Sequence, residues 1–103
     1  MTPRFVFHPA ARAELREARD WYDGQRSGLG RELGDVVATT LERIAAHPEA
    51  YPAVFGTLRR AVLSRFPYAL FYRRRAAAPD VIEVLAVFHH RRDPATWRRR
   101  AAV

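Results

Sequence analysis

Apolar residues recur along the first half of the chain with the period of an α-helix. From Ala10 to Asp23 they fall on one helical face, and from Leu29 to His47 they recur every three or four residues until Pro48 ends the pattern. The five residues between these segments include two glycines and are predicted to form a loop. Two amphipathic helices joined by so short a loop are expected to lie antiparallel, with both apolar faces turned to one core.

Four further segments have the apolar and aromatic content of β-strands. They are residues 4–8, 58–64, 68–73 and 81–88. The last segment is apolar at every position except Glu83. It is therefore predicted to be a central strand with both of its faces covered.

The segments between and after these strands complete the predicted order of elements. Residues 48–56 are predicted to be a connector, residues 74–80 a mobile loop too long for a tight hairpin turn, and residues 94–100 a last turn of helix. The order is β-α-α-β-β-β with a short final α. We expect a single α+β domain over residues 1–103, in which a helical hairpin packs on a small, mostly antiparallel sheet.

The composition excludes several kinds of site and cellular location for this domain. The chain has no cysteine, so it cannot carry a disulfide or a thiolate metal site. The apolar run near the N-terminus is too short for a signal peptide, and no apolar stretch reaches the roughly 18 residues of a membrane span. We therefore expect a cytoplasmic protein with no membrane partner.

Charge is distributed unevenly along the chain. The formal net charge is +7, and all 18 basic residues are arginines. Residues 1–51 hold seven arginines and eight acidic residues, whereas residues 52–103 hold eleven arginines and three acidic residues, a net charge of +8. This separation indicates an anionic partner for the second half, either nucleic acid or an acidic protein segment.

The candidate metal-binding and proton-transferring residues lie in the polar segment that follows the predicted strand 81–88. Adjacent His89 and His90 would point to opposite faces of a strand, and no third ligand has useful spacing, so no metal site is expected. A metal-independent ribonuclease would need a proton acceptor, a proton donor and cations around one phosphate. Either histidine could accept the proton, and the cation could be Arg59, Arg60, Arg65 or Arg73. The alternative is that the histidines only end a strand and the arginines form a solvated strand face.

Several segments, taken in order, resemble the RelE/ParE family of bacterial toxins. The matching residues are 7–15, 21–22, 28–30, 44–48, 51–52, 60, 65–73, 84–94 and Trp97, with residues 84–94 reading Val-Leu-Ala-Val-Phe-His-His-Arg-Arg-Asp-Pro. The resemblance covers nearly the whole chain. It implies the toxin component of a type II toxin–antitoxin module, with no cofactor, that is neutralised by a cognate antitoxin with an acidic C-terminal tail.

The family divides by target, and two departures favour its ParE-like, plasmid-stabilisation branch. Ribonuclease members carry an arginine just before the apolar pair and tyrosine of the third strand, where this chain has Ala69. They also end on a catalytic tyrosine, and this chain has none after Tyr72. We expect a non-enzymatic toxin whose candidate target is DNA gyrase. The alternatives are a RelE-like endoribonuclease that cuts mRNA on the ribosome, with His89, His90 and Arg65 as its catalytic residues, and a protein that retains only antitoxin binding.

Two sets of contact residues follow from the charge distribution and the resemblance. The predicted target-binding residues are Arg59, Arg60, Arg65, Arg73, His90, Arg91, Arg92 and Arg98. The predicted antitoxin-binding residues are Trp21, Tyr22, Leu29, Arg60, Tyr68 and Tyr72.

Overall fold

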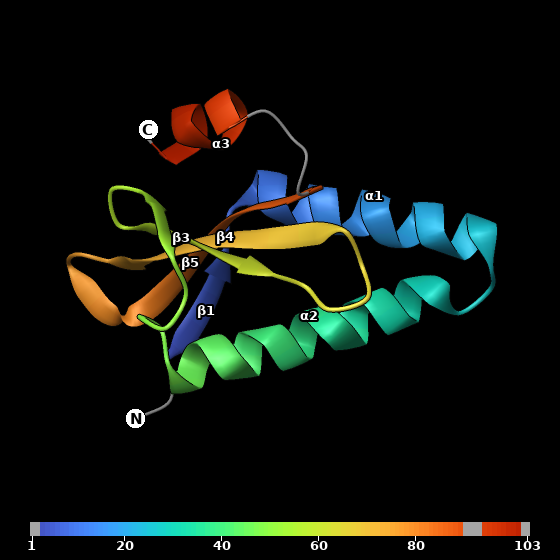
Figure 1. Cartoon of the computed structure of the whole chain (residues 1–103), viewed down its shortest axis with the longest axis horizontal. Coiled ribbons are helices and arrows are strands. Elements are labelled where there is room, and N and C mark those ends of the chain that lie inside the picture. Colours follow the sequence, from blue (N-terminus) through green and yellow to red (C-terminus); the bar gives the residue numbers. More distant parts are fainter. Residues whose placement is uncertain (1–2, 90–93, 102–103) are drawn as a thin grey trace.

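A computed structural model of the chain, which describes residues 3–89 and 94–101, shows a helical hairpin packed on a five-stranded sheet (Figure 1). A short C-terminal helix lies at the opposite side of the sheet from α2 (Figure 1). The elements in order are β1 (Arg4–Phe7), α1 (Pro9–Gln25), α2 (Leu29–Ala46), β2 (Ala53–Phe55), β3 (Leu58–Val62), β4 (Tyr68–Arg75), β5 (Ala78–His89) and α3 (Pro94–Ala101).

Local sequence sets the ends of the two long helices. The His8 side chain caps α1, because its Nδ1 accepts a hydrogen bond from the backbone N of Ala10 at 3.1 Å, and Pro9 follows at the first helical position. Gly28 precedes α2 with a φ of +89°, a left-handed conformation that glycine adopts without strain. At the other end of α2, His47 is the C-cap and Pro48 cannot continue the helix.

The sheet has the strand order β1-β5-β4-β3-β2. β1 runs parallel to β5, with Phe7 opposite Val84, and the other neighbouring pairs are antiparallel. The predicted α+β class and the predicted mostly antiparallel sheet are therefore confirmed. β5 is an interior strand that is buried on both faces, as its sequence predicted, although β4 occupies the middle of the sheet.

Each face of the sheet has its own apolar cluster. On the first face, α1 and α2 pack on strand residues that include Tyr72 and Val84. On the second face, Leu58, Phe71, Phe88 and their neighbours form a separate cluster, against which Val54 and Ala101 pack. Because Ala101 ends α3, the C-terminal helix covers part of this second face.

Two sequence predictions about loops were wrong. The predicted connector 48–56 contains the short edge strand β2, which pairs with β3 at Ala53 and Phe55. The predicted long loop 74–80 is a two-residue turn, because β4 continues to Arg75 and β5 already starts at Ala78. Pairing of Arg75 with Ala78 extends both strands, and cross-strand hydrogen bonds outweigh the weak strand propensity of alanine and proline there.

Candidate functional site

Five rings gather where α1 approaches the β3–β4 turn and the end of β5. Trp21, Tyr22, Phe66, Tyr68 and His89 meet edge to face, with centroids 5.0 Å apart for Trp21–Tyr22 and Tyr22–Phe66 and 5.7 Å apart for Tyr68–His89. We call these residues the aromatic cluster. Trp21 has 59% of its surface exposed. Single exposed tryptophans backed by other rings are typical anchors of protein interfaces.

A groove runs beside the aromatic cluster, between α1 and the end of β5. It has a volume of about 230 Å³, and its walls include Glu17, Ala18, Trp21, Tyr68 and His89. Burial, and then the proximity of Tyr68, raise the pKa of the Tyr22 phenol. The Tyr22 phenol of the aromatic cluster is therefore neutral near neutral pH.

The structure brings together only some of the six residues predicted to bind an antitoxin. Trp21, Tyr22 and Tyr68 belong to the aromatic cluster, and Leu29, at the start of α2, packs on the first-face core. Tyr72 is buried near the other end of α2, where its hydroxyl donates to the carbonyl oxygen of Pro48 at 2.6 Å. Arg60 lies opposite Phe71 on the second face. No signal in the sequence separates these two groups.

Neighbouring Arg59 and Arg60 point to opposite faces of the sheet, as successive residues of a strand must. On the first face, Nη1 of Arg59 donates to the carbonyl oxygens of Glu49 at 3.2 Å and Tyr51 at 2.6 Å, and so fixes the connector after α2. On the second face, Nε of Arg60 is buried and has no hydrogen-bond partner among the described residues. The two arginines therefore cannot contact one phosphate together.

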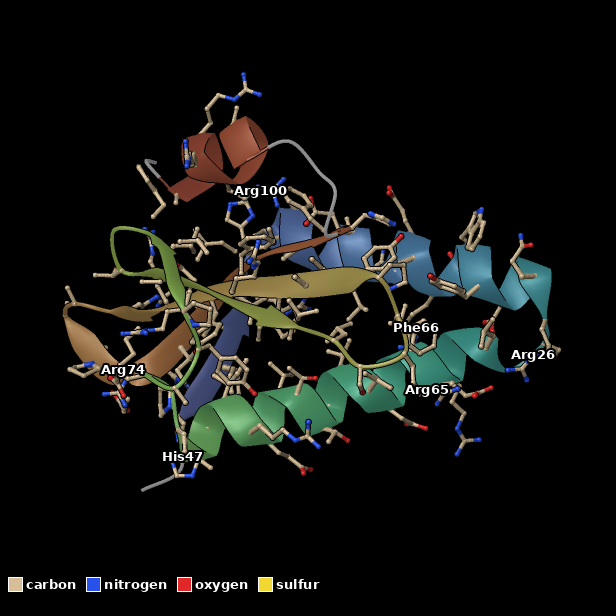
Figure 2. All side chains as sticks on the ribbon, viewed as in Figure 1. Arg26, His47, Arg65, Phe66, Arg74 and Arg100 are labelled. Atoms are coloured by element: carbon tan, nitrogen blue, oxygen red, sulfur yellow. The ribbon has the colours of Figure 1, made fainter. Side chains whose placement is uncertain are left out.

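Arg65 lies in the β3–β4 turn and adopts a φ of +68°, which is unusual for a residue with a side chain. Its Nη2 is 2.7 Å from Oε1 of Glu32, and Nη2 of Arg26 is 2.8 Å from the other oxygen of that carboxylate. The hydrogen bonds from Arg65 and then Arg26 lower the pKa of Glu32. Figure 2 shows that the Arg65 side chain extends along α2 toward Arg26.

The arginines of β4 and α3 make different contacts within the fold. Arg73 contacts Glu83 on β5 at 3.3 Å and donates to the carbonyl oxygen of Ala101 at 2.9 Å, so it ties β4 to α3. The guanidinium of Arg98 lies over the ring of Phe55, 5.9 Å from its centroid. Of the other predicted contact residues, His90, Arg91 and Arg92 lie outside the described part of the chain.

An ion pair that the sequence analysis did not identify joins α1 to α3. Nη2 of Arg100 is 2.9 Å from Oε2 of Glu14, and its Nη1 donates to Oε1 of Glu14 and to the carbonyl oxygen of Leu85, each at 3.0 Å. Oε1 of Glu14 also accepts from the backbone N of Val87 at 3.0 Å. A signal was present, because Glu14 falls on the apolar face of α1 with Ala11 and Ala18.

The residues proposed for ribonuclease chemistry do not converge in the described structure. The exposed His89 ends β5 beside Tyr68, whereas Arg65 turns to Glu32 on α2. Ala69, which stands where ribonuclease members carry an arginine, is fully buried in the second-face cluster. Within residues 3–89 and 94–101, no three histidine or acidic side chains lie close enough to hold a metal ion. None of the helices described there is long and apolar enough to cross a membrane.

The fold is shared with a known toxin–antitoxin assembly. A solved structure titled "Chromosomal ParDE TA system from P. aeruginosa" is similar to 85% of this chain and to 96% of the matched chain, with a TM-score of 0.71 and 14% sequence identity. The family model of the ParE toxin of the type II toxin–antitoxin system parDE matches residues 5–94. The chain therefore belongs to the ParE toxin family and is a type II toxin. No curated protein matches it.

Proposed function

We propose that this toxin inhibits growth by binding an essential target rather than by cutting RNA, and that DNA gyrase is that target. The proposal rests on membership of the ParE family and on the absence of a convergent acid–base site in the described residues. Binding requires only that charge and apolar surface be presented to a partner. RNA cleavage requires an acid, a base and a cation around a single phosphorus atom.

The placement of the arginines is the observation that carries this proposal. Arg59, Arg65 and Arg73 lie at three separate places, and each contacts a different carboxylate or backbone carbonyl. A ribonuclease would turn several of these guanidiniums toward one point, with a histidine beside them. Cations spread over a surface are instead suited to an extended interface, in which each contributes modestly.

The direct test is a supercoiling assay with purified DNA gyrase and relaxed plasmid. We expect the toxin to inhibit supercoiling as its concentration rises, and we expect the cognate antitoxin, added in excess, to restore it. If gyrase is unaffected by saturating toxin while ribosome-bound mRNA is cleaved, the ribonuclease alternative replaces this proposal.

We further propose that the aromatic cluster is the main contact for the antitoxin. Trp21 stands exposed above Tyr22 and beside Tyr68, and the neighbouring groove can receive an apolar side chain. Acidic residues of the antitoxin tail would then meet cations nearby, of which Arg65 is 57% exposed. A disordered tail that folds on binding suits a surface of this kind.

Trp21→Ala tests this contact. Because Trp21 is mostly exposed, the variant should fold normally, whereas the loss of an interface anchor should cost about 2 kcal/mol or more, or roughly thirtyfold in affinity. Affinity for the antitoxin is measured by titration, and protection is measured as growth on co-expression. Phe55→Ala is the matched control, because Phe55 is also an exposed aromatic residue but lies on β2. Equal weakening in the two variants would contradict the assignment.

A further inference from the structure

A hollow lies at the opposite end of the first face from the β3–β4 turn, where the end of α2 meets the β2–β3 and β4–β5 turns. Its volume is about 400 Å³, and the functional groups on its walls belong to Glu49, Thr57, Arg59, Tyr72, Arg74 and Arg75. Figure 2 shows Arg74 at the same end of the molecule as His47, far from Arg65. The hollow is therefore separate from the aromatic cluster.

Positive charge is in excess around this hollow. Nε of Arg74 is 3.4 Å from a carboxylate oxygen of Glu49, and Nη2 of Arg75 is 3.2 Å from one of Glu83, which Arg73 also contacts. Of the charged side chains on its walls, Arg59, Arg74 and Arg75 are cationic and only Glu49 is anionic. Arg74 and Arg75 are both nearly half exposed, so they can turn toward a bound anion.

Backbone carbonyls of the connector after α2 already accept hydrogen bonds near the hollow. Here the hydroxyl of Tyr72 donates to the carbonyl of Pro48, and Arg59 donates to the carbonyls of Glu49 and Tyr51. Burial raises the pKa of Tyr72 to about 12, so its phenol stays neutral at cellular pH. The anchored Arg59 guanidinium is held in place before any ligand arrives.

The remaining walls are apolar. Pro48, Gly56, Ala76 and Pro79 line the hollow together with Tyr72. Cationic groups and apolar residues on the walls of one hollow suit a ligand with a flat apolar body and an anionic group. The volume falls within the roughly 300–1,000 Å³ of small-molecule sites.

We propose that this hollow binds a nucleoside phosphate, with the phosphate groups on Arg74 and Arg75 and the base against the two prolines. Planar guanidiniums bind phosphate oxygens in pairs, which gives both affinity and orientation. The site adds a small-molecule ligand to the toxin, and it does not depend on which cellular target the toxin binds.

The test uses the full chain and fluorescent N-methylanthraniloyl-ADP, with unlabelled ADP, inorganic phosphate and an oligothymidylate as competitors. We expect saturable binding that ADP displaces, and at least about tenfold weaker binding when Arg74 and Arg75 are both changed to alanine. Arg12→Ala with Arg16→Ala is the matched control, because it removes the same charge from the exposed face of α1 and should change the affinity by less than about twofold. Ala76→Trp fills the hollow without changing charge and should block binding as well; it decides the matter if the double alanine variant does not fold.

Three results would overturn the proposal. The first is the absence of saturable binding, and the second is an equal loss of affinity in the α1 control. The third is displacement by inorganic phosphate or oligothymidylate as effective as displacement by ADP. Inorganic phosphate would show that the apolar walls add nothing to recognition, and oligothymidylate would show a surface for nucleic acid instead of a nucleoside phosphate site.

Discussion

Arg65 combines a strained backbone with an exposed charge. Its positive φ costs of the order of 1 kcal/mol, since a side chain crowds the backbone in that conformation. A strained backbone of this kind is retained where the side chain has a functional or structural role. Here the side chain forms an ion pair with Glu32 and stays largely exposed. A glycine at this position would keep the turn and remove the charge.

Arg65→Gly is therefore expected to fold with a free energy of unfolding within about 1 kcal/mol of the parent, because relief of strain offsets the greater freedom of glycine in the unfolded chain. Growth inhibition should fall, since an exposed cation of the predicted target surface is lost. Urea denaturation and induced growth arrest measure the two effects. Unchanged growth inhibition would remove Arg65 from the target surface.

The same substitution changes the titration of Glu32. Its pKa is lowered in the parent chiefly by the hydrogen bond from Arg65, so this carboxylate contributes stability above its unfolded pKa and loses that contribution as the pH falls through its folded pKa. In Arg65→Gly the pKa of Glu32 should rise toward its ordinary value, with only Arg26 left as a partner. NMR titration of the carboxyl carbon measures it, and an unmoved pKa would show that the ion pair does not form in solution.

The carboxylate of Glu14 connects α1 to both β5 and α3. β1 ends at Phe7, so it does not pair with the last part of β5, and the Glu14 carboxylate accepts the hydrogen bond from Val87 there. The same carboxylate binds Arg100, and both side chains are less than one-fifth exposed. Removal of one partner leaves the other charge and a backbone N–H in a poorly solvated place.

Glu14→Ala should consequently lower the free energy of unfolding by about 3 kcal/mol or more, as for the breaking of a buried ion pair. Glu14→Gln should cost less, because its amide oxygen still accepts from Val87. Glu17→Ala, on the exposed side of the same helix, is the control and should stay within about 0.5 kcal/mol of the parent. Thermal and urea unfolding measure all three. A loss in Glu14→Ala no larger than that in the control would show that the pair is not formed.

At the scale of elements, the helical hairpin depends on one close approach. Gly30, in the first turn of α2, is buried; its backbone N donates to Oδ1 of Asp23 at 2.7 Å, and its carbonyl accepts from Nε of Arg19 at 3.2 Å. A Cβ at this position would collide with the backbone oxygen of Arg19 and lie 2.8 Å from the Asp23 carboxylate. Only glycine lets α1 and α2 meet here.

Gly30→Ala should destabilise the protein by about 1–3 kcal/mol, because the helices must move apart to make room for the methyl group. Gly34→Ala is the matched control one turn later on α2. Its nearest neighbour would be the flexible end of the Arg19 side chain, at 3.2 Å, and alanine favours a helix interior by up to about 1 kcal/mol over glycine. We expect Gly34→Ala to be neutral or stabilising in urea denaturation. Equal stability of the two variants would contradict the packing described for Gly30.

The elements that the sequence predicted correctly are those with a strong period. Both long helices, the aromatic strand β4 and the apolar β5 follow from spacing alone, and their order defines the fold class. β2 was missed because it has only three residues and follows Pro52, and the β4–β5 turn was missed because Ala76 and Ala77 carry no turn signal. Both elements are stabilised by pairing between strands, and this pairing cannot be predicted from the local sequence pattern.

The candidate site was predicted less completely, for a related reason. Of the residues predicted to bind an antitoxin, Trp21, Tyr22 and Tyr68 lie together, whereas Tyr72 and Arg60 lie on other parts of the sheet. Their contact with an antitoxin stays a prediction. The Glu14–Arg100 pair joins residues that are 86 positions apart. Contacts of that separation depend on how the strands are ordered, and the sequence alone did not supply this order.

Across the molecule, net charge differs between the elements formed by the first half of the chain and those formed by the second half. β1 and the helical hairpin come from the half of the chain with a net charge of −1, whereas β2 to β5 and α3 come from the half with +8. A field of this kind steers an anionic partner toward the sheet and the C-terminal helix, and it weakens as salt is added. Under the proposed function, this field would attract both a DNA-bound target and an acidic antitoxin tail, and we propose that the two compete for this surface.

The central claim is growth inhibition by binding, and the double variant His89→Ala with His90→Ala tests it most directly. A ribonuclease that used these histidines would lose about 10²–10⁴ in rate, whereas a binding toxin would lose little. Parent and variant are induced in a host without the antitoxin, while cell length, mRNA integrity and protein synthesis are followed together. We predict that the folded variant keeps most of its growth inhibition, and that the parent causes filamentation and a DNA-damage response before any loss of mRNA. Cleavage of mRNA at ribosomal positions within the first minutes, together with a harmless double variant, would contradict the account.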